Sequence, residues 1–133
     1  MSLHSEILEQ PERLAGLLAK QRTVVEEVAC EIKKRGVNYV MLAARGTSDN
    51  AGRYANYLLG SRNGLALALA TPSLFTYYQT PPRLKDALVI GISQSGQSPD
   101  IVSVLAEGKK QGCLTLAITN EPNSPLAKTA NFV

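Results

Sequence analysis

The stretch that decides the fold is ALVIGISQSGQSPDIV, at residues 87–102. Its unbroken apolar run predicts a strand over 87–93, of the kind that is buried on both faces of a parallel sheet. The polar segment that follows, 94–98, ends at Pro99, a residue that favours the first position of a helix. The succession of strand, Gly/Ser-rich loop and helix therefore predicts an α/β protein built from strand–helix units.

The same succession recurs on both sides of this stretch. Continuous apolar runs predict further strands over 39–44, 65–69 and 113–118, and residues 131–133 have the pattern of the opening of a fifth strand. The first four strands start at 39, 65, 87 and 113, which are 26, 22 and 26 residues apart. Strand–helix units have this spacing, so we expect a doubly wound parallel sheet.

A helical segment is expected ahead of the sheet. Residues 1–36 form this segment, and the sheet-containing domain covers 37–133. Apolar residues recur in the segment at three- and four-residue steps, which predicts a helix that opens at Pro11, kinks near Gln21 and ends at Gly36. The last predicted strand has only begun at the final residue, so we expect the chain to be part of a longer protein.

Composition excludes several classes of function. The 133 residues are 44% hydrophobic and 19% charged, which is enough apolar material for one packed domain. Few aromatic residues and a net charge of only +3 disfavour nucleic-acid binding. No apolar run is long enough to cross a membrane, and no secretory signal is visible. Cys30 and Cys113 form no CxxC pair, which is typical of a reduced, cytoplasmic protein without a disulfide framework.

Candidate catalytic residues are few. The single histidine, His4, lies near the terminus, so the body of the chain has no Ser-His-Asp or Cys-His pair and no histidine metal site. If the chain catalyses a proton transfer alone, its candidate bases are Asp49, Asp100 and Glu121. Neither GxGxxG nor Gly-Lys-Ser/Thr occurs. We therefore expect no nucleotide cofactor and no metal.

Two loops carry the candidate binding residues. They cover 45–48 and 93–98, after the first and third strands, and both run into helices, the first expected from Asp49. In a sheet of order 2-1-3-4-5, ligands bind at the switch point between strands one and three. Hydroxyls at helix N-termini beside Gly46 and Gly96 favour phosphate or another anion. These hydroxyls belong to Thr47, Ser48, Ser93, Ser95 and Ser98.

The same residues also have ordinary structural interpretations. Ser48 and Ser98 are common helix N-cap residues, and either could serve only to cap. Asp49 and Asp100 lie in first helical turns, where carboxylates commonly interact with the helix dipole. Arg45, the cation of these loops, either contacts an anion or faces water. The meeting of both loops at one switch point favours anion binding over capping.

At these loops the sequence resembles the sugar isomerase (SIS) domain family. The resemblance covers nearly the whole chain and rests on four motifs, at 6–11, 44–48, 92–96 and 119–126. It is to the isomerase part of glucosamine-fructose-6-phosphate aminotransferases and to glucosamine-6-phosphate deaminases. The resemblance implies a three-layer sandwich around a five-stranded parallel sheet of order 2-1-3-4-5, with a bound hexose phosphate.

The resemblance also implies roles for particular residues. The phosphate would be held by Ser93, Ser95, Ser98 and Thr47. Ser48 and Gln94 would reach sugar hydroxyls. Ser98 stands where the aminotransferases usually carry Thr, and Gln97 replaces their usual Glu. Family members of this type carry two such domains, the second of which supplies the catalytic Glu and Lys, so we expect no catalytic residue in this chain.

Our leading hypothesis is that the chain is the phosphosugar-binding half of an isomerase or deaminase. Its substrate would be an aminosugar or hexose 6-phosphate, such as fructose 6-phosphate or glucosamine 6-phosphate, and we expect it to form a homodimer. Two alternatives remain open. One is a non-catalytic phosphosugar-sensing domain of a regulator, and the other is a single-domain isomerase.

Overall fold

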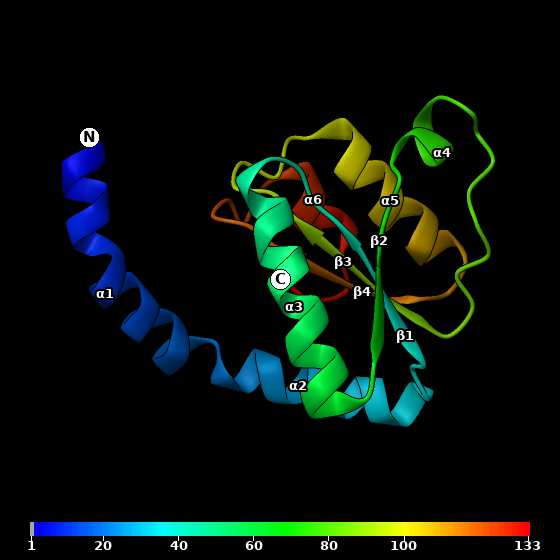
Figure 1. The fold of residues 1–133 in the computed structure, drawn as a ribbon, viewed down its shortest axis with the longest axis horizontal. Coiled ribbons are helices and arrows are strands. Elements are labelled where there is room, and N and C mark those ends of the chain that lie inside the picture. The colour runs from blue at the N-terminus through cyan, green and yellow to red at the C-terminus, as the bar shows by residue number, and fades with distance from the viewer. Residues whose placement is uncertain (1) are drawn as a thin grey trace.

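The computed structural model describes residues 2–133, which form a parallel sheet flanked by helices and preceded by a helical arm (Figure 1). In chain order the elements are α1 (Leu3–Lys20), α2 (Arg22–Arg35), β1 (Tyr39–Ala43), α3 (Thr47–Asn63), β2 (Ala66–Leu69), α4 (Ser73–Thr76), β3 (Ala87–Ile92), α5 (Pro99–Lys110), β4 (Leu114–Ile118) and α6 (Pro125–Thr129). The strands fall within or beside the apolar runs that predicted them, which confirms the α/β fold class.

The four strands form one parallel sheet in the order β2-β1-β3-β4. This order agrees with the first four places of the predicted 2-1-3-4-5. The described residues form four strands rather than the predicted five, although Phe132 lies beside β4, where the opening of the fifth strand was predicted. Phe132 forms only a single parallel bridge, with Leu116 of β4.

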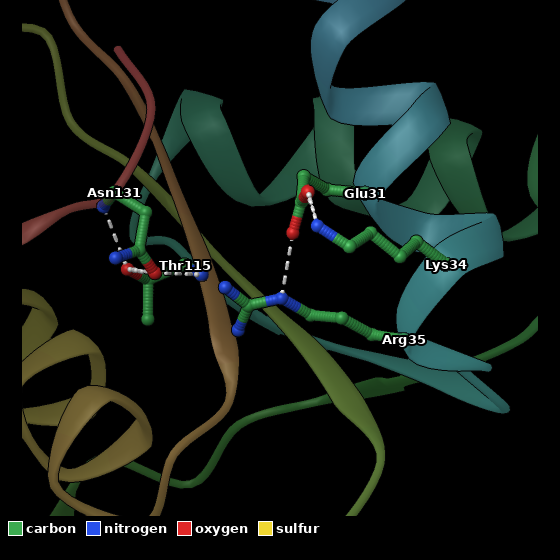
Figure 2. A network of polar contacts seen from close by, with 5 residues as sticks. All are labelled: Glu31, Lys34, Arg35, Thr115 and Asn131. Atoms are coloured by element: carbon green, nitrogen blue, oxygen red, sulfur yellow. Dashed lines mark hydrogen bonds and ion pairs between the residues drawn. The ribbon is translucent and has the colours of Figure 1, made fainter.

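A side chain explains why backbone pairing beside β4 begins only at Phe132. Figure 2 shows Asn131 turned toward Thr115, with its Oδ1 accepting hydrogen bonds from the Thr115 backbone N–H at 3.0 Å and from the Thr115 hydroxyl at 2.9 Å. The Thr115 hydroxyl in turn accepts the Asn131 N–H at 2.9 Å. Because the Asn131 side chain occupies the Thr115 N–H that a neighbouring strand would use, no backbone ladder forms beside β4 ahead of Phe132.

Apolar side chains cover both faces of the sheet and produce three layers. On one face, Val40 and Leu42 of β1 pack in a cluster that includes Leu59 of α3. On the other, Val89 of β3 packs in a cluster with buried residues of α5 and α6. Helix α5 lies close to the sheet because Gly108 has no side chain. A Cβ at this position would stand only 2.8 Å from the Val89 side chain. The layers fix the ends of α3 and α5 against the sheet.

The N-terminal segment differs from its prediction in one respect. A helix was expected to open at Pro11, but α1 runs through Pro11 without a break. Since α1 is solvent-exposed, water can satisfy the carbonyl of Ile7 that proline leaves without a partner. The predicted kink is confirmed, because Gln21 separates α1 from α2.

In the last turn of α2, a hydrogen bond from Arg35 lowers the pKa of Glu31 (Figure 2).

Helix α1 extends away from the sheet (Figure 1) and contains no buried residue. Its large exposed apolar side chains are Leu3, Ile7, Leu8, Leu14, Leu17 and Leu18. A groove of about 650 Å³ lies where the α1–α2 junction meets the end of β4, and its lining includes Leu17, Val25 and Ile118. Across residues 2–133, no helix combines the length and the apolarity that a membrane span requires.

Candidate functional site

The two predicted loops leave the sheet at adjacent positions. Loop one, residues 44–46, joins β1 to α3, and loop two, residues 93–98, joins β3 to α5. Strands β1 and β3 are neighbours, and Ala43 at the end of β1 pairs with Gly91 near the end of β3. The switch point of the observed strand order therefore lies between these loops, as the sequence predicted.

Hydrogen bonds between backbone N–H groups and serine hydroxyl oxygens hold the turn of loop two. Ser93 is buried, and its hydroxyl oxygen accepts the Gly96 N–H at 3.2 Å. The Ser93 and Ser98 hydroxyl oxygens lie 3.4 Å apart. The exposed Ser95 accepts the Gln97 N–H at 3.3 Å. The loop thus brings three of the six predicted binding residues together around one turn.

Gly96 is required by both backbone conformation and space. Its φ of +63° lies in the left-handed region that side-chain-bearing residues rarely adopt. A Cβ at this position would overlap the side chain of Ser124, at 2.1 Å from Oγ and 2.4 Å from Cβ. The Gly96 carbonyl also accepts the Leu126 N–H at 3.1 Å. The turn of loop two is therefore packed directly on the start of α6.

The hydroxyls at the two helix starts do not cap their helices. Helix α3 begins at Thr47, two residues earlier than predicted, and its N-cap is Gly46, so Ser48 lies inside the first turn. Ser98 occupies the N-cap position of α5, yet its side chain makes no capping hydrogen bond. The N-cap interpretation is therefore wrong for Ser48, whereas Ser98 has the predicted N-cap position without the capping hydrogen bond. Their hydroxyls, with that of the exposed Thr47, are available at the mouth of the two loops.

A third segment, residues 119–124, supports loop two. The exposed residue Gln94 offers its carbonyl to two donors, the Asn120 N–H and the Thr119 hydroxyl, each at 3.1 Å. Ser124 caps α6 by accepting the Ala127 N–H at 3.3 Å. Sequence reasoning matched this segment to a family motif but assigned no role to Thr119 or Ser124. Both residues position loop two. This role could not be inferred from the sequence, because the two residues are far from loop two along the chain.

The three candidate bases have different surroundings. Asp49 pairs with Arg53, one turn further along α3, at 3.1 Å. Asp100, in the first turn of α5, forms an ion pair with Arg45 of loop one. Glu121 is exposed and forms no ion pair with residues 2–133. Over the same residues no group of three or more His, Cys, Asp or Glu side chains is arranged to hold a metal ion.

Two titratable groups with displaced pKa values lie at the amino-terminal ends of the strands, opposite the two loops. Burial raises the pKa of the Cys113 thiol, which donates to the Leu84 carbonyl at 2.9 Å. Burial also raises the pKa of Tyr39, at the amino end of β1. Because both groups are at the amino ends of their strands, neither contributes to loops one and two.

Comparison with known families assigns the fold to a group of proteins. The SIS domain family matches residues 34–133, which contain the entire sheet and both loops. The chain belongs to the SIS domain family. The match begins inside α2, so α1 lies outside the part of the chain that defines the SIS domain.

Relatives of this SIS domain include enzymes and a regulator. The glutamine–fructose-6-phosphate aminotransferase of Bradyrhizobium diazoefficiens is 32% identical over an alignment that covers 96% of this chain and 22% of that protein. A candidate phosphosugar isomerase from Silicibacter pomeroyi DSS-3 has a TM-score of 0.90 and 37% identity, over 96% of this chain and 39% of that one. The sugar isomerase domain of an RpiR transcription factor from Sphaerobacter thermophilus has a TM-score of 0.75 and 26% identity, over 98% of this chain and 73% of that one. The chain thus spans about a fifth of the length of the curated relatives it matches.

Proposed function

We propose that this SIS domain binds a hexose or aminosugar 6-phosphate between loop one and loop two. The observation that carries the proposal is the gathering of hydroxyl groups at the switch point, of which those of Ser48 and Ser98 cap no helix. Ser93 and Ser98 face each other in loop two. Relatives of the chain include an aminotransferase that is named for fructose 6-phosphate and a candidate phosphosugar isomerase.

Each loop contributes a different part of the proposed site. The phosphate lies against Ser93, Ser95 and Ser98, with Thr47 closing it from the start of α3. Hydroxyl groups and backbone N–H groups suit a phosphate because each donates to an anionic oxygen without bringing a charge of its own. Ser48 and Gln94 lie at the mouth of the loops, where they reach sugar hydroxyls.

The reaction that this binding serves is an aldose–ketose isomerisation, with or without loss of ammonia. A base removes a proton from the carbon next to the carbonyl and returns it to the neighbouring carbon. The phosphate is remote from these carbons, so its binding energy holds and orients the sugar during proton transfer. The chain contributes this fixed handle to a parent isomerase, aminotransferase or deaminase.

We assign the base to a part of the parent enzyme outside residues 2–133. Asp49 and Asp100 are each engaged by an arginine, and Glu121 lies in an exposed turn. In this proposal the chain consists of a helical segment at 1–36 and a phosphosugar-binding domain at 37–133. The parent enzyme contains a second domain of the same kind, which supplies the base. We therefore expect no isomerase turnover from the 133 residues alone.

A second candidate function is phosphosugar sensing without catalysis. The observation that favours it is the likeness to the sugar isomerase domain of the RpiR transcription factor. Both functions use the same binding site and differ in what the site controls. Isomerase activity that depends on a second domain would favour the first function, whereas ligand-dependent DNA binding by the parent protein would favour the second.

The exposed apolar side chains of α1 and the groove beside β4 suit a homodimer in the cytoplasm. Leu14, Leu17 and Leu18 are each more than half exposed, which is unusual for leucines that recur along one helix. Sedimentation analysis tests this association, with Leu17→Glu as the variant expected to remain monomeric. A monomer at every concentration of the unaltered chain would contradict it.

The decisive test of ligand binding is calorimetric titration. The chain is titrated with fructose 6-phosphate, glucosamine 6-phosphate and each sugar without its phosphate. We expect heat only from the phosphorylated sugars, and loss of binding in Ser95→Ala. The matched control is Ser61→Ala, which removes an exposed hydroxyl in the last turn of α3. Equal binding of sugars with and without phosphate would contradict the proposal.

A further inference from the structure

An ion pair joins the two loops across the proposed site. Arg45 precedes Gly46 in loop one, and Asp100 follows loop two in the first turn of α5. The Arg45 Nε contacts Asp100 Oδ2. The two residues are far apart in the sequence, so the contact exists only because β1 and β3 are neighbours in the sheet.

The two partners differ in their exposure to solvent. The side chain of Asp100 is 17% exposed, and its Oδ2 is shielded from solvent and accepts no aligned hydrogen bond within residues 2–133. The side chain of Arg45 is 70% exposed. A guanidinium has five N–H donors, so anchoring its Nε leaves the remaining donors in solvent beside loop one.

Asp100 also occupies the N-terminal end of α5. Its Oδ1 accepts the Ile101 backbone N–H at 3.1 Å, one of the donors that a helix start would otherwise offer to an anion. This carboxylate is negatively charged, so by itself it opposes a phosphate. A phosphate that binds here therefore benefits from a cation placed beside the carboxylate, and Arg45 is that cation.

Building on the proposed function, we propose that Arg45 is a specificity-determining residue that pairs with the phosphate of the sugar. Asp100 is the positioning residue that holds the guanidinium between the loops. The loop hydroxyls are neutral donors, and hydrogen bonds between a guanidinium and a phosphate are about twice as strong as neutral ones. Arg45 thus raises the preference for a phosphorylated sugar over a neutral sugar.

The test compares four variants by calorimetric titration with fructose 6-phosphate and with fructose. In Arg45→Gln we expect the Kd for fructose 6-phosphate to rise about tenfold, the size of one charge-assisted hydrogen bond. In Asp100→Asn we expect a rise of about threefold, because Arg45 is no longer held. The double variant is expected to bind more tightly than Arg45→Gln, because the opposing carboxylate is gone, but more weakly than the unaltered chain, because the hydrogen bonds of the guanidinium are still missing. Arg53→Gln is the matched control, because Arg53 is equally exposed and pairs with an aspartate on its own helix.

The double variant separates this inference from charge neutralisation. If Arg45 only cancels the charge of Asp100, removing both charges restores the affinity of the unaltered chain, and that result overturns the inference. Unchanged affinity in Arg45→Gln also overturns it. If Ser95→Ala loses binding while Arg45→Gln keeps it, the proposed function stands and this inference fails. No binding of fructose 6-phosphate by the unaltered chain overturns both.

Circular dichroism identifies any variant that fails to fold. Arg45→Lys provides a second variant, which keeps the positive charge but lacks the planar guanidinium. We expect its affinity to lie between those of the unaltered chain and Arg45→Gln. Affinity in Arg45→Lys as low as in Arg45→Gln, in a folded protein, would show that charge contributes nothing and would overturn the role of Arg45 in pairing with the phosphate.

Discussion

Loop one and loop two occupy equivalent places after neighbouring strands, yet they are held in different ways. In loop two the hydroxyl oxygens of Ser93 and Ser95 accept hydrogen bonds from the loop's own backbone N–H groups, and Thr119 donates to the Gln94 carbonyl. No side chain caps α3 at the end of loop one, and the loop is tied across the site by the Arg45–Asp100 ion pair. Loop two is thus held by several hydrogen bonds, of which the Gly96–Ser93 bond is buried, whereas loop one depends on one ion pair whose arginine is exposed.

The difference indicates a division of labour within the proposed site. Hydrogen bonds within the chain set the shape of loop two before any ligand binds. Loop one and the adjoining start of α3 carry exposed groups, Arg45 and Thr47, that can adjust to the bound sugar. Mutations in loop two should therefore reduce both stability and binding, whereas mutations of the exposed side chains at loop one should reduce binding alone.

Glycine substitutions should give the largest contrast between the loops. Gly96→Ala places a Cβ against Ser124 and at positive φ, so we expect the free energy of unfolding to fall by about 3 kcal/mol or more. Gly46→Ala has the same sign of φ but nothing within 4 Å of the new Cβ. We expect it to cost about 1–2 kcal/mol, from the backbone conformation alone. Urea denaturation measures both values, and equal losses would contradict the proposed difference in packing.

Hydroxyl deletions should separate stability from binding. Ser93→Ala removes the buried acceptor of the Gly96 N–H, so we expect a loss of about 1.5 kcal/mol in the free energy of unfolding, together with weaker binding of fructose 6-phosphate. Thr47→Ala removes an exposed hydroxyl of α3's first residue. It should weaken binding while leaving the denaturation midpoint unchanged. A stability loss in Thr47→Ala as large as in Ser93→Ala would contradict the comparison.

The smallest effect is expected beneath loop two. Thr119→Val keeps the side-chain volume but removes the hydroxyl that donates to the Gln94 carbonyl, at an expected cost of about 0.5 kcal/mol and a twofold rise in the Kd for fructose 6-phosphate. The matched control is Thr76→Val, whose hydroxyl donates to the Pro72 carbonyl within α4. It should lose similar stability without any change in binding. Equally weakened binding in Thr76→Val would contradict a specific contribution of the Thr119 hydroxyl to the binding site.

Much of the fold could be predicted because the strands are short apolar runs bounded by Gly and Ser. The run before Ser93 and the run before Arg45 gave the two central strands and placed both loops at the switch point. The passage of α1 through Pro11 could not be predicted, because it depends on solvent reaching the carbonyl of Ile7. Local propensity treats proline as a break wherever it occurs.

The parts of the site that escaped prediction are those made by distant segments. The sequence correctly predicted Ser98 as the N-cap residue of α5, but only the structure shows that its hydroxyl lies opposite Ser93 and makes no capping hydrogen bond. Arg45 could be interpreted as an anion contact or as a solvated side chain, and only the fold places it beside Asp100. Contacts of this kind depend on the pairing of β1 with β3, which no local pattern encodes.

The position of β2 at one end of the sheet has a consequence for aggregation. Its four residues, Ala66–Leu69, contain neither a charge nor a proline, and three of them are exposed. An uncharged edge strand is a template for strand addition by another molecule, and proteins commonly guard such edges with lysine or proline. Here the main protection is brevity, because four residues offer too few hydrogen bonds to hold a second chain. Lengthening this strand would convert a tolerated edge into a site of self-assembly.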